Sequence, residues 1–124
     1  MALTQVATQL NFCDLPVWGG VTQLGGTILS ENVQDIDVFW QVELGQPTDS
    51  VSAGFFGTAQ GKYRLVYPFS EQAVIVYGEV KILDESTGIE KIYRQGDMWV
   101  VEKGTSTVWE VLSDRYIKHY FYVI

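Results

Sequence analysis

Apolar and polar residues alternate along much of the chain in the manner of β-strands. Over residues 73–83 the side chains repeat with a period of two, and both faces of this segment are partly apolar. Residues 116–124 are rich in β-branched and aromatic side chains and form too short a run for a helix. The pattern predicts strands at 33–43, 51–56, 62–67, 73–83, 89–95, 98–102, 107–112 and 116–124.

Turn-forming residues separate these runs at short intervals. Gly61, the acidic stretch 84–88, the pair Gly96 and Asp97, and residues 103–105 favour turns because glycine permits positive φ and Asp or Ser accepts from local amides. A further turn is expected at 46–49. Short spacing without a helical pattern predicts an antiparallel sandwich or barrel.

The first thirty residues carry the weakest pattern. We expect an N-terminal arm or edge strand over residues 1–30, broken at Gly19 and Gly20 and again at Gly25 and Gly26. Residues 1–10 have no cation and no continuous apolar core, so they do not resemble a signal peptide. The expected location is therefore cytoplasmic.

The chain's size and charge exclude several classes of protein. Its 124 residues and 14.0 kDa fit a single domain, 1–124. The net charge is −7, and all eight cations follow Gln60, which leaves no basic face for nucleic acid or anionic lipid. No apolar run reaches the roughly 18 residues of a membrane span. We therefore expect neither a nucleic-acid partner nor a membrane.

The chain has one cysteine, Cys13, and one histidine, His119. A disulfide framework or a cysteine-based zinc site cannot be built within one such chain, and neither can a metal site of several imidazoles.

Two sequence motifs resemble those of the cupin superfamily. Residues 61–71 lead into Gly78-Glu79-Val80, and residues 96–104 are followed by residues 107–111. The pattern is similar to the single-domain branch named after ureidoglycine aminohydrolase, and it covers residues 54–124. The resemblance implies an all-β fold, the antiparallel double-stranded β-helix of RmlC-like jelly-roll barrels.

In the wider superfamily these motifs supply three histidines and a glutamate to a divalent metal ion. Glu71 falls at the glutamate position, with six residues between it and Gly78, whereas Thr107 falls at the histidine position of the second motif. The two histidine positions of the first motif correspond to Leu65 and Tyr67, or to Arg64 and Val66 in the alternative register. Because none of these is an imidazole, we expect a cupin barrel with no metal and no cofactor.

Candidate site residues lie within these motifs and the last strand. Glu71 is a candidate acid, base or ligand anchor, and a rim carboxylate paired with Arg64 is the alternative. Thr107 replaces a ligand, and its hydroxyl could also bond across strands. A second set consists of aromatic residues that could form a ligand wall or simply fill the core: Tyr67, Tyr77, Trp99 and Trp109.

His119 and two cations complete the candidates. His119 alternates with Ile117 and Phe121, which favours a place in the interior or at an interface, and a proton shuttle is the alternative. Arg64 and Lys118 are the cations most able to reach a pocket, although we expect both to be solvated at the surface.

Three functions remain open at this point. The first is a small-molecule-binding cupin, and the second is a metal-independent isomerase, epimerase or lyase that uses Glu71, Tyr67 and His119. The third is a structural module in which exposed edge strands are buried by dimerisation. We expect a homodimer and a small-molecule ligand, and whether the protein is an enzyme is left open.

Overall fold

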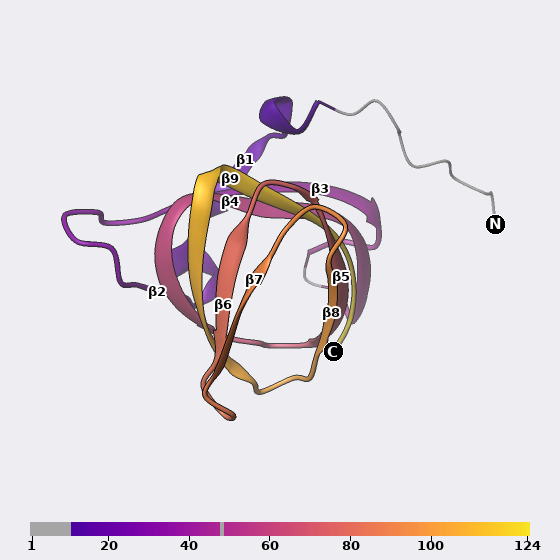
Figure 1. Cartoon of the computed structure of the whole chain (residues 1–124). Coiled ribbons are helices and arrows are strands. Elements are labelled where there is room, and N and C mark those ends of the chain that lie inside the picture. Colours follow the sequence, from indigo (N-terminus) through magenta and orange to yellow (C-terminus); the bar gives the residue numbers. More distant parts are fainter. Residues whose placement is uncertain (1–10, 48) are drawn as a thin grey trace.

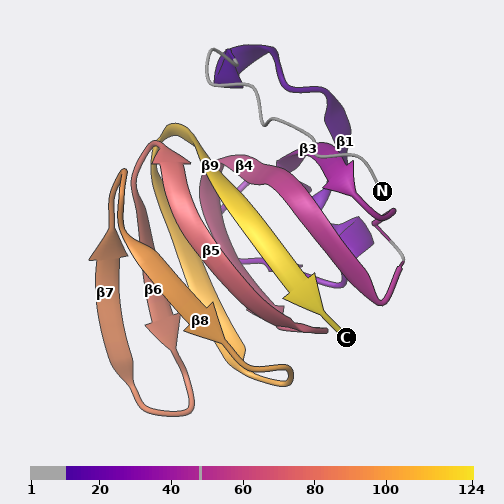
Figure 2. The same ribbon diagram turned by 90° about the vertical axis from the view of Figure 1, so that its right-hand side faces the viewer.

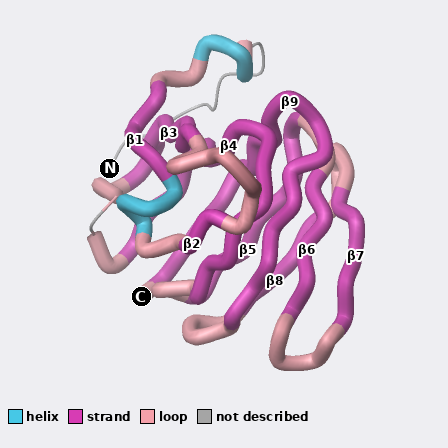
Figure 3. Tube along the Cα trace, turned by 90° about the vertical axis from the view of Figure 1, so that its left-hand side faces the viewer, coloured by secondary structure: helices cyan, strands magenta, loops and turns pink. Residues whose placement is uncertain are grey.

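The computed structural model describes residues 11–47 and 49–124, and strands dominate it (Figure 1). The elements are η1 (Phe12–Asp14), β1 (Val17–Gly20), η2 (Val21–Leu24), β2 (Thr27–Ile28), β3 (Asp37–Leu44), β4 (Val51–Val66), β5 (Ser70–Tyr77), β6 (Val80–Asp84), β7 (Ile89–Tyr93), β8 (Met98–Val101) and β9 (Ser106–Val123). The two short 3₁₀ helices lie in the N-terminal region (Figure 3). Within the described ranges no helix has the length and apolar character of a membrane span.

Two long strands, β4 and β9, form the spine of the barrel. They pair antiparallel from Val51 opposite Val123 to Val66 opposite Ser106. Their register shifts between Ala59 and Gly61, where the pair bends. This bend lets the same two strands enter both layers of the barrel (Figure 2).

The remaining strands complete the two layers. In one layer the order is β1-β3-β4-β9-β5-β8. In the other, β2 pairs with the end of β4, while β6 pairs with the beginning of β9 and with β7. All these pairings are antiparallel, so the predicted antiparallel jelly-roll is confirmed.

Several predicted strand limits were wrong because glycines and bulges bend strands as well as end them. The segments predicted at 51–56 and 62–67 form the single strand β4, and those at 107–112 and 116–124 form β9. The segment predicted at 73–83 is instead divided at Gly78. The strand expected from residue 33 begins at Asp37.

The turns follow the sequence more closely. Residues 84–88 connect β6 to β7, and Gly88 has a φ of 73°. Asp97 accepts a hydrogen bond from the Arg94 amide at 2.8 Å, as expected of a turn aspartate. At 46–49 the Asp49 amide donates to the Gln46 carbonyl at 3.0 Å, and residue 48 lies outside the described residues.

The N-terminal region is partly an edge strand. β1 pairs with β3 at the edge of its layer, and Gly25 ends η2 with a φ of 87°. Gly19 and Gly20 do not break the chain but lie within β1, where the Asp35 carboxylate approaches Gly20 too closely for a Cβ atom. Residues 1–10 of the predicted arm, and with them the signal-peptide prediction, lie outside the described residues.

The chain buries two apolar clusters on opposite sides of the β4–β9 pair. The larger one fills the barrel with aromatic side chains: Trp40, Tyr63, Tyr67, Trp109, Tyr116, Tyr120 and Tyr122. The smaller one lies outside the barrel, where Leu15 packs with Phe39, Phe55 and Ile117. The N-terminal segment therefore covers part of the outer face of the sheet.

Gly78 and Gly88 provide a matched test of the corner between β5 and β6. Both have positive φ, so an alanine at either should cost about 1–2 kcal/mol. A Cβ at Gly88 meets nothing within 4 Å, whereas one at Gly78 would lie 2.2 Å from the Arg115 carbonyl oxygen. We expect Gly88→Ala to reduce the unfolding free energy by the cost of the backbone strain alone. Gly78→Ala should reduce it by about 2–5 kcal/mol, because overpacking of about 1–3 kcal/mol adds to the strain. Urea unfolding measures both losses, and equal losses would contradict this account of the corner.

Candidate functional site

The inward faces of three strands meet around a small cavity in the barrel. Tyr67 follows the end of β4, Glu71 lies near the start of β5, and Lys118 lies on β9. The cavity has a volume of about 50 Å³ and is partly open. Its lining is mainly apolar, and it includes Phe56, Leu65, Tyr67, Glu71, Trp109, Tyr116 and Lys118.

A buried ion pair forms the polar part of this lining. Lys118 Nζ lies 2.8 Å from Glu71 Oε1 and 3.0 Å from Oε2, and the two residues are only 4% and 3% exposed. Lys118 Nζ also donates to the Tyr67 hydroxyl at 3.3 Å, and this hydroxyl donates to Glu71 Oε2 at 2.7 Å. Trp99 Nε1 is a weaker donor to the same oxygen at 3.4 Å. The three protons of the ammonium group therefore all face acceptors.

Aromatic rings surround the ammonium group on its other sides. Lys118 Nζ lies 4.9 Å from the ring centre of Phe56 and 5.2 Å from that of Trp109. The rings of Tyr67 and Trp99 are both 5.6 Å away. The negative faces of such rings attract a cation, which offsets part of the cost of removing Lys118 from water.

Burial changes the acidity of the groups in the barrel. Loss of water lowers the pKa of Lys118, although the charge and hydrogen bonds of Glu71 act in the opposite direction. Burial raises the pKa of Tyr67 well above its ordinary value, and the negative charge of Glu71 raises it further. At neutral pH the Tyr67 phenol therefore stays protonated and serves as a hydrogen-bond donor to Glu71.

Thr107 and Trp109 form a hydrogen-bonded wall beside Tyr67. Trp109 Nε1 donates to Thr107 Oγ1 at 2.8 Å, and Thr107 Oγ1 donates to the Leu65 carbonyl at 2.8 Å. A second cavity of about 90 Å³ touches Tyr67, Trp99, Thr107 and Trp109 and extends to Asp84 and Thr105. The Tyr67 and Trp109 rings thus lie between the two cavities.

The structure settles the register that the sequence left open. Leu65 and Tyr67 face the interior, whereas Arg64 and Val66 lie on the other face of β4. The interior register of the first motif is therefore the one with Leu65 and Tyr67, the first of the two that the resemblance allowed.

This set of side chains does not fit a divalent metal ion. Glu71 is the one carboxylate among the residues that line the cavity, and Lys118 already binds both of its oxygens. Throughout residues 11–47 and 49–124, no three His, Cys, Asp or Glu side chains come together as a metal site. The isobutyl group of Leu65, the phenol of Tyr67 and the Thr107 hydroxyl, which is bonded to a carbonyl, are poor substitutes for imidazole ligands.

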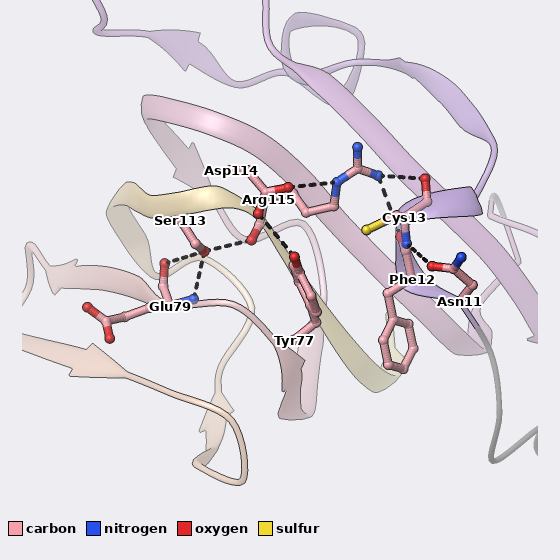
Figure 4. Close-up of polar contacts among 8 residues, drawn as sticks. All are labelled: Asn11, Phe12, Cys13, Tyr77, Glu79, Ser113, Asp114 and Arg115. Atoms are coloured by element: carbon pink, nitrogen blue, oxygen red, sulfur yellow. Dashed lines mark hydrogen bonds and ion pairs between the residues drawn. The ribbon is translucent and has the colours of Figure 1, made fainter.

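Five of the predicted site residues are brought together by the fold, namely Tyr67, Glu71, Trp99, Thr107 and Trp109. Three others are not. Arg64 points outward and pairs with Glu85 at 2.8 Å, not with Glu71. Tyr77 lies on the outer surface and donates to Asp114 at 3.3 Å (Figure 4). His119 packs edge to face on Phe55, outside the barrel.

The outer cluster around Tyr77 has a structural role. Arg115 Nη1 donates to the carbonyl oxygens of Phe12 and Cys13 at 3.5 and 3.3 Å (Figure 4). The Phe12 ring packs on Tyr77 and Phe55. These contacts fasten η1 to the outer face of the sheet.

Lys118 is the site residue that sequence reasoning placed wrongly. We expected Lys118 at the surface and His119 in the interior or at an interface, but β9 turns Lys118 into the barrel and His119 outward. Lys118 alternates with Ile117 and His119 and so shares its face with Tyr116, Tyr120 and Tyr122. Because both faces of this segment are apolar, the periodicity alone does not say which one is inside. The signal was a single cation on a face otherwise made of tyrosines.

The antiparallel jelly-roll and its motif positions place the protein among the cupins. The sequence model of the EutQ-like cupin domain family matches residues 45–120, more than half of the chain, and the chain belongs to this family. The resemblance to the ureidoglycine-aminohydrolase-type branch stays a prediction. A search of curated proteins found no significant match.

Solved cupin structures share the fold at low sequence identity. The EutQ protein of Clostridium difficile is 13% identical with a TM-score of 0.59, over 71% of this chain and 68% of that one. A protein of unknown function from Pseudomonas syringae pv. tomato is 14% identical with a TM-score of 0.63, over 76% and 40%. The Cnp3 cupin domain of Schizosaccharomyces pombe is 11% identical with a TM-score of 0.56, over 69% and 64%. These likenesses support the fold alone.

The buried pair should show strong energetic coupling. Lys118→Met alone or Glu71→Gln alone leaves the other buried group without its partner. Each should cost about 3–5 kcal/mol of unfolding free energy. The double variant should recover most of this loss. Lys81 and Glu110, an outer pair at 3.0 Å with both side chains about one third exposed, provide the matched control, for which we expect at most about 1 kcal/mol of coupling. A double-mutant cycle by urea unfolding measures both, and coupling no larger inside than outside would refute the assignment.

Three fully buried tyrosines predict a steep loss of stability in alkali. Burial is the main cause that raises the pKa values of Tyr63, Tyr67 and Tyr116. Their contribution is fully present below the unfolded pKa of about 10 and is lost as the pH rises toward the folded values. In this window each tyrosine should lower the unfolding free energy by about 1.4 kcal/mol per pH unit, and the three together by about 4 kcal/mol per pH unit. Urea midpoints and tyrosinate absorbance test this, and ionisation of these tyrosines near pH 10 in the folded protein would contradict it.

Proposed function

We propose that this EutQ-like cupin binds a small uncharged molecule in its barrel without a metal ion. The observation that carries the proposal is the Glu71–Lys118 pair, a polar wall in an otherwise aromatic cavity. Ligand sites commonly combine an apolar lining with a few well-placed polar groups.

The contacts of the pair support the absence of a metal. In a metal-binding cupin the glutamate gives its oxygens to the ion, but here Lys118 takes both within 3.0 Å. A divalent ion beside Lys118 would meet a like charge at short range in a water-poor interior. The ammonium group thus supplies the positive charge that a metal would otherwise bring.

The charge balance of the cavity favours an uncharged ligand. Glu71 and Lys118 together contribute no net charge, and the ammonium protons are already directed at Glu71 and Tyr67. A carboxylate ligand would have to displace Glu71 from Lys118, and an ammonium ligand would have to displace Lys118 from Glu71. A neutral hydroxyl or carbonyl group can instead bond to the rim of the pair without separating it.

The cavity size limits the ligand to a few non-hydrogen atoms. Its volume of about 50 Å³ is far below the roughly 300–1,000 Å³ of ordinary drug-sized pockets. At about 1.5 kcal/mol per atom for the best small ligands, four atoms give at most about 6 kcal/mol, or a Kd no tighter than tens of micromolar. The ligand search therefore needs millimolar concentrations.

Only two of the three residues predicted to act in an isomerase, epimerase or lyase, Glu71 and Tyr67, lie at the cavity. The Tyr67 hydroxyl lies 2.7 Å from Glu71 Oε2, but His119 lies outside the barrel. His119 therefore cannot exchange a proton with a ligand in the cavity. The raised pKa of Tyr67 makes its phenol a weak acid at neutral pH. Binding is therefore better supported than acid–base catalysis by this pair.

The predicted homodimer stays a prediction. Phe121 and Val100 point outward from the sheet and are 44% and 77% exposed, which leaves apolar surface on β9 and β8. The residue register places both in the same row, with Gln72 between them.

A thermal-shift screen of matched small molecules tests the proposal. We expect short uncharged compounds such as propan-1-ol, at millimolar concentration, to raise Tm by a few degrees, whereas acetate and methylammonium should not. Leu65→Phe should fill the cavity and abolish the shift. Val66→Phe, on the outward face of the same strand at 54% exposure, should leave it intact. A shift that persists in Leu65→Phe, or equal shifts with charged compounds, would refute the proposal.

A further inference from the structure

We propose that Lys118 captures small aldehydes covalently, its amine forming an imine with the carbonyl carbon inside the barrel. The inference rests on the proposed function and extends it by naming the class of ligand and the atom that binds it. The observation behind it is that the Lys118 amine, the Glu71 carboxylate and the Tyr67 phenol lie within 3.3 Å of one another at the wall of a cavity. Binding of an uncharged molecule does not need all three groups together.

The geometry gives the amine a proton acceptor and a water-poor setting. Glu71 Oε1 lies 2.8 Å from Lys118 Nζ, close enough to accept the proton that must leave before the nitrogen can attack. Burial also lowers the pKa of Lys118, which favours the free amine relative to an exposed lysine. Lysines placed in apolar pockets are activated as nucleophiles in this way.

The step balances without any other reagent. The Lys118 ammonium passes one proton to Glu71, and the free nitrogen adds to the carbonyl carbon while the C=O electron pair moves to oxygen. Glu71 then protonates this oxygen to a hydroxyl, takes a second proton from the nitrogen and passes it to the same hydroxyl. The nitrogen lone pair then forms the C=N bond as the C–O bond breaks, and one water leaves. The net change joins an ammonium ion and an aldehyde to give an iminium ion and water, with Glu71 again a carboxylate.

The charge distribution favours the adduct because the iminium ion keeps the positive charge of the ammonium ion. Glu71 still faces a cation, so no buried charge loses its partner. The rings of Phe56 and Trp109, at 4.9 and 5.2 Å from Nζ, can stabilise the iminium cation as they do the ammonium.

The cavity selects the size and shape of the carbonyl compound. About 50 Å³ of mainly apolar space beside Lys118 accommodates a short aliphatic aldehyde and excludes bulky or charged ones. The Tyr67 and Trp109 rings close the side toward the second cavity. Propanal is therefore a suitable probe, and propan-1-ol is its analogue without a carbonyl group.

Reductive trapping on the full chain tests the inference. The protein is incubated with propanal and cyanoborohydride, which reduces an imine to a stable propyl-lysine, and peptide mass spectrometry measures the rate at each lysine. Lys62, Lys91 and Lys103 are exposed and serve as internal controls. Because burial lowers the pKa of Lys118 and so increases its free-amine fraction, we expect Lys118 to react several-fold faster than each of these three. A rate at Lys118 equal to or below theirs would overturn the inference.

A variant and the alcohol separate this inference from the proposed function. Leu65→Phe, which fills the cavity beside Lys118, should slow trapping at Lys118 to the rate of the exposed lysines or below, with Lys91 unchanged. If propan-1-ol raises Tm but Lys118 is not trapped selectively, aldehyde capture is wrong and the binding proposal stands. If neither occurs, both are wrong. The comparison among lysines within the natural protein needs no variant, so it remains valid even if Leu65→Phe fails to fold.

Discussion

A buried ammonium group must keep its counter-ion, and this requirement organises the interior of the barrel. Lys118 and Glu71 are almost completely removed from water, and either one alone would cost several kcal/mol. Tyr67 and Trp99 supply the remaining hydrogen bonds, while aromatic rings surround the ammonium group. The ion pair therefore fixes the relative positions of β4, β5, β8 and β9, and any ligand must leave a cation opposite Glu71.

The backbone makes this meeting possible. Because β4 and β9 bend and enter both layers, residues that follow or lie on distant strands point at the same interior. Gly78 turns the chain from one layer to the other, with its α-carbon too close to the Arg115 carbonyl for a side chain. The outer face is occupied differently, with Phe12 and Leu15 covering part of the sheet. The same β9 strand thus presents a tyrosine and lysine face to the cavity and a histidine and phenylalanine face outward.

Sequence patterns predicted the architecture well and the site in part. The turns at 84–88 and at Gly96 and Asp97, the antiparallel barrel, and the clustering of Tyr67, Glu71, Thr107 and Trp109 all follow from local turn chemistry and from motif positions. The inward place of Lys118 did not, because residues 116–124 are apolar on both faces and a one-residue change of register exchanges Lys118 with His119. Arg64 lies at the surface as expected, but its partner there is Glu85, on a distant turn, and not Glu71. Long-range pairing of this kind has no signature within a single strand.

The central claim is that Lys118, not a metal ion, neutralises Glu71 inside the barrel. A high-resolution crystal structure of the protein grown with zinc, iron or manganese, together with metal analysis of the same sample, tests it most directly. We expect electron density for the Lys118 side chain to end within hydrogen-bond distance of both Glu71 oxygens, with less than stoichiometric metal in the protein. An ion bound to Glu71, with Lys118 directed away from it, would contradict the account.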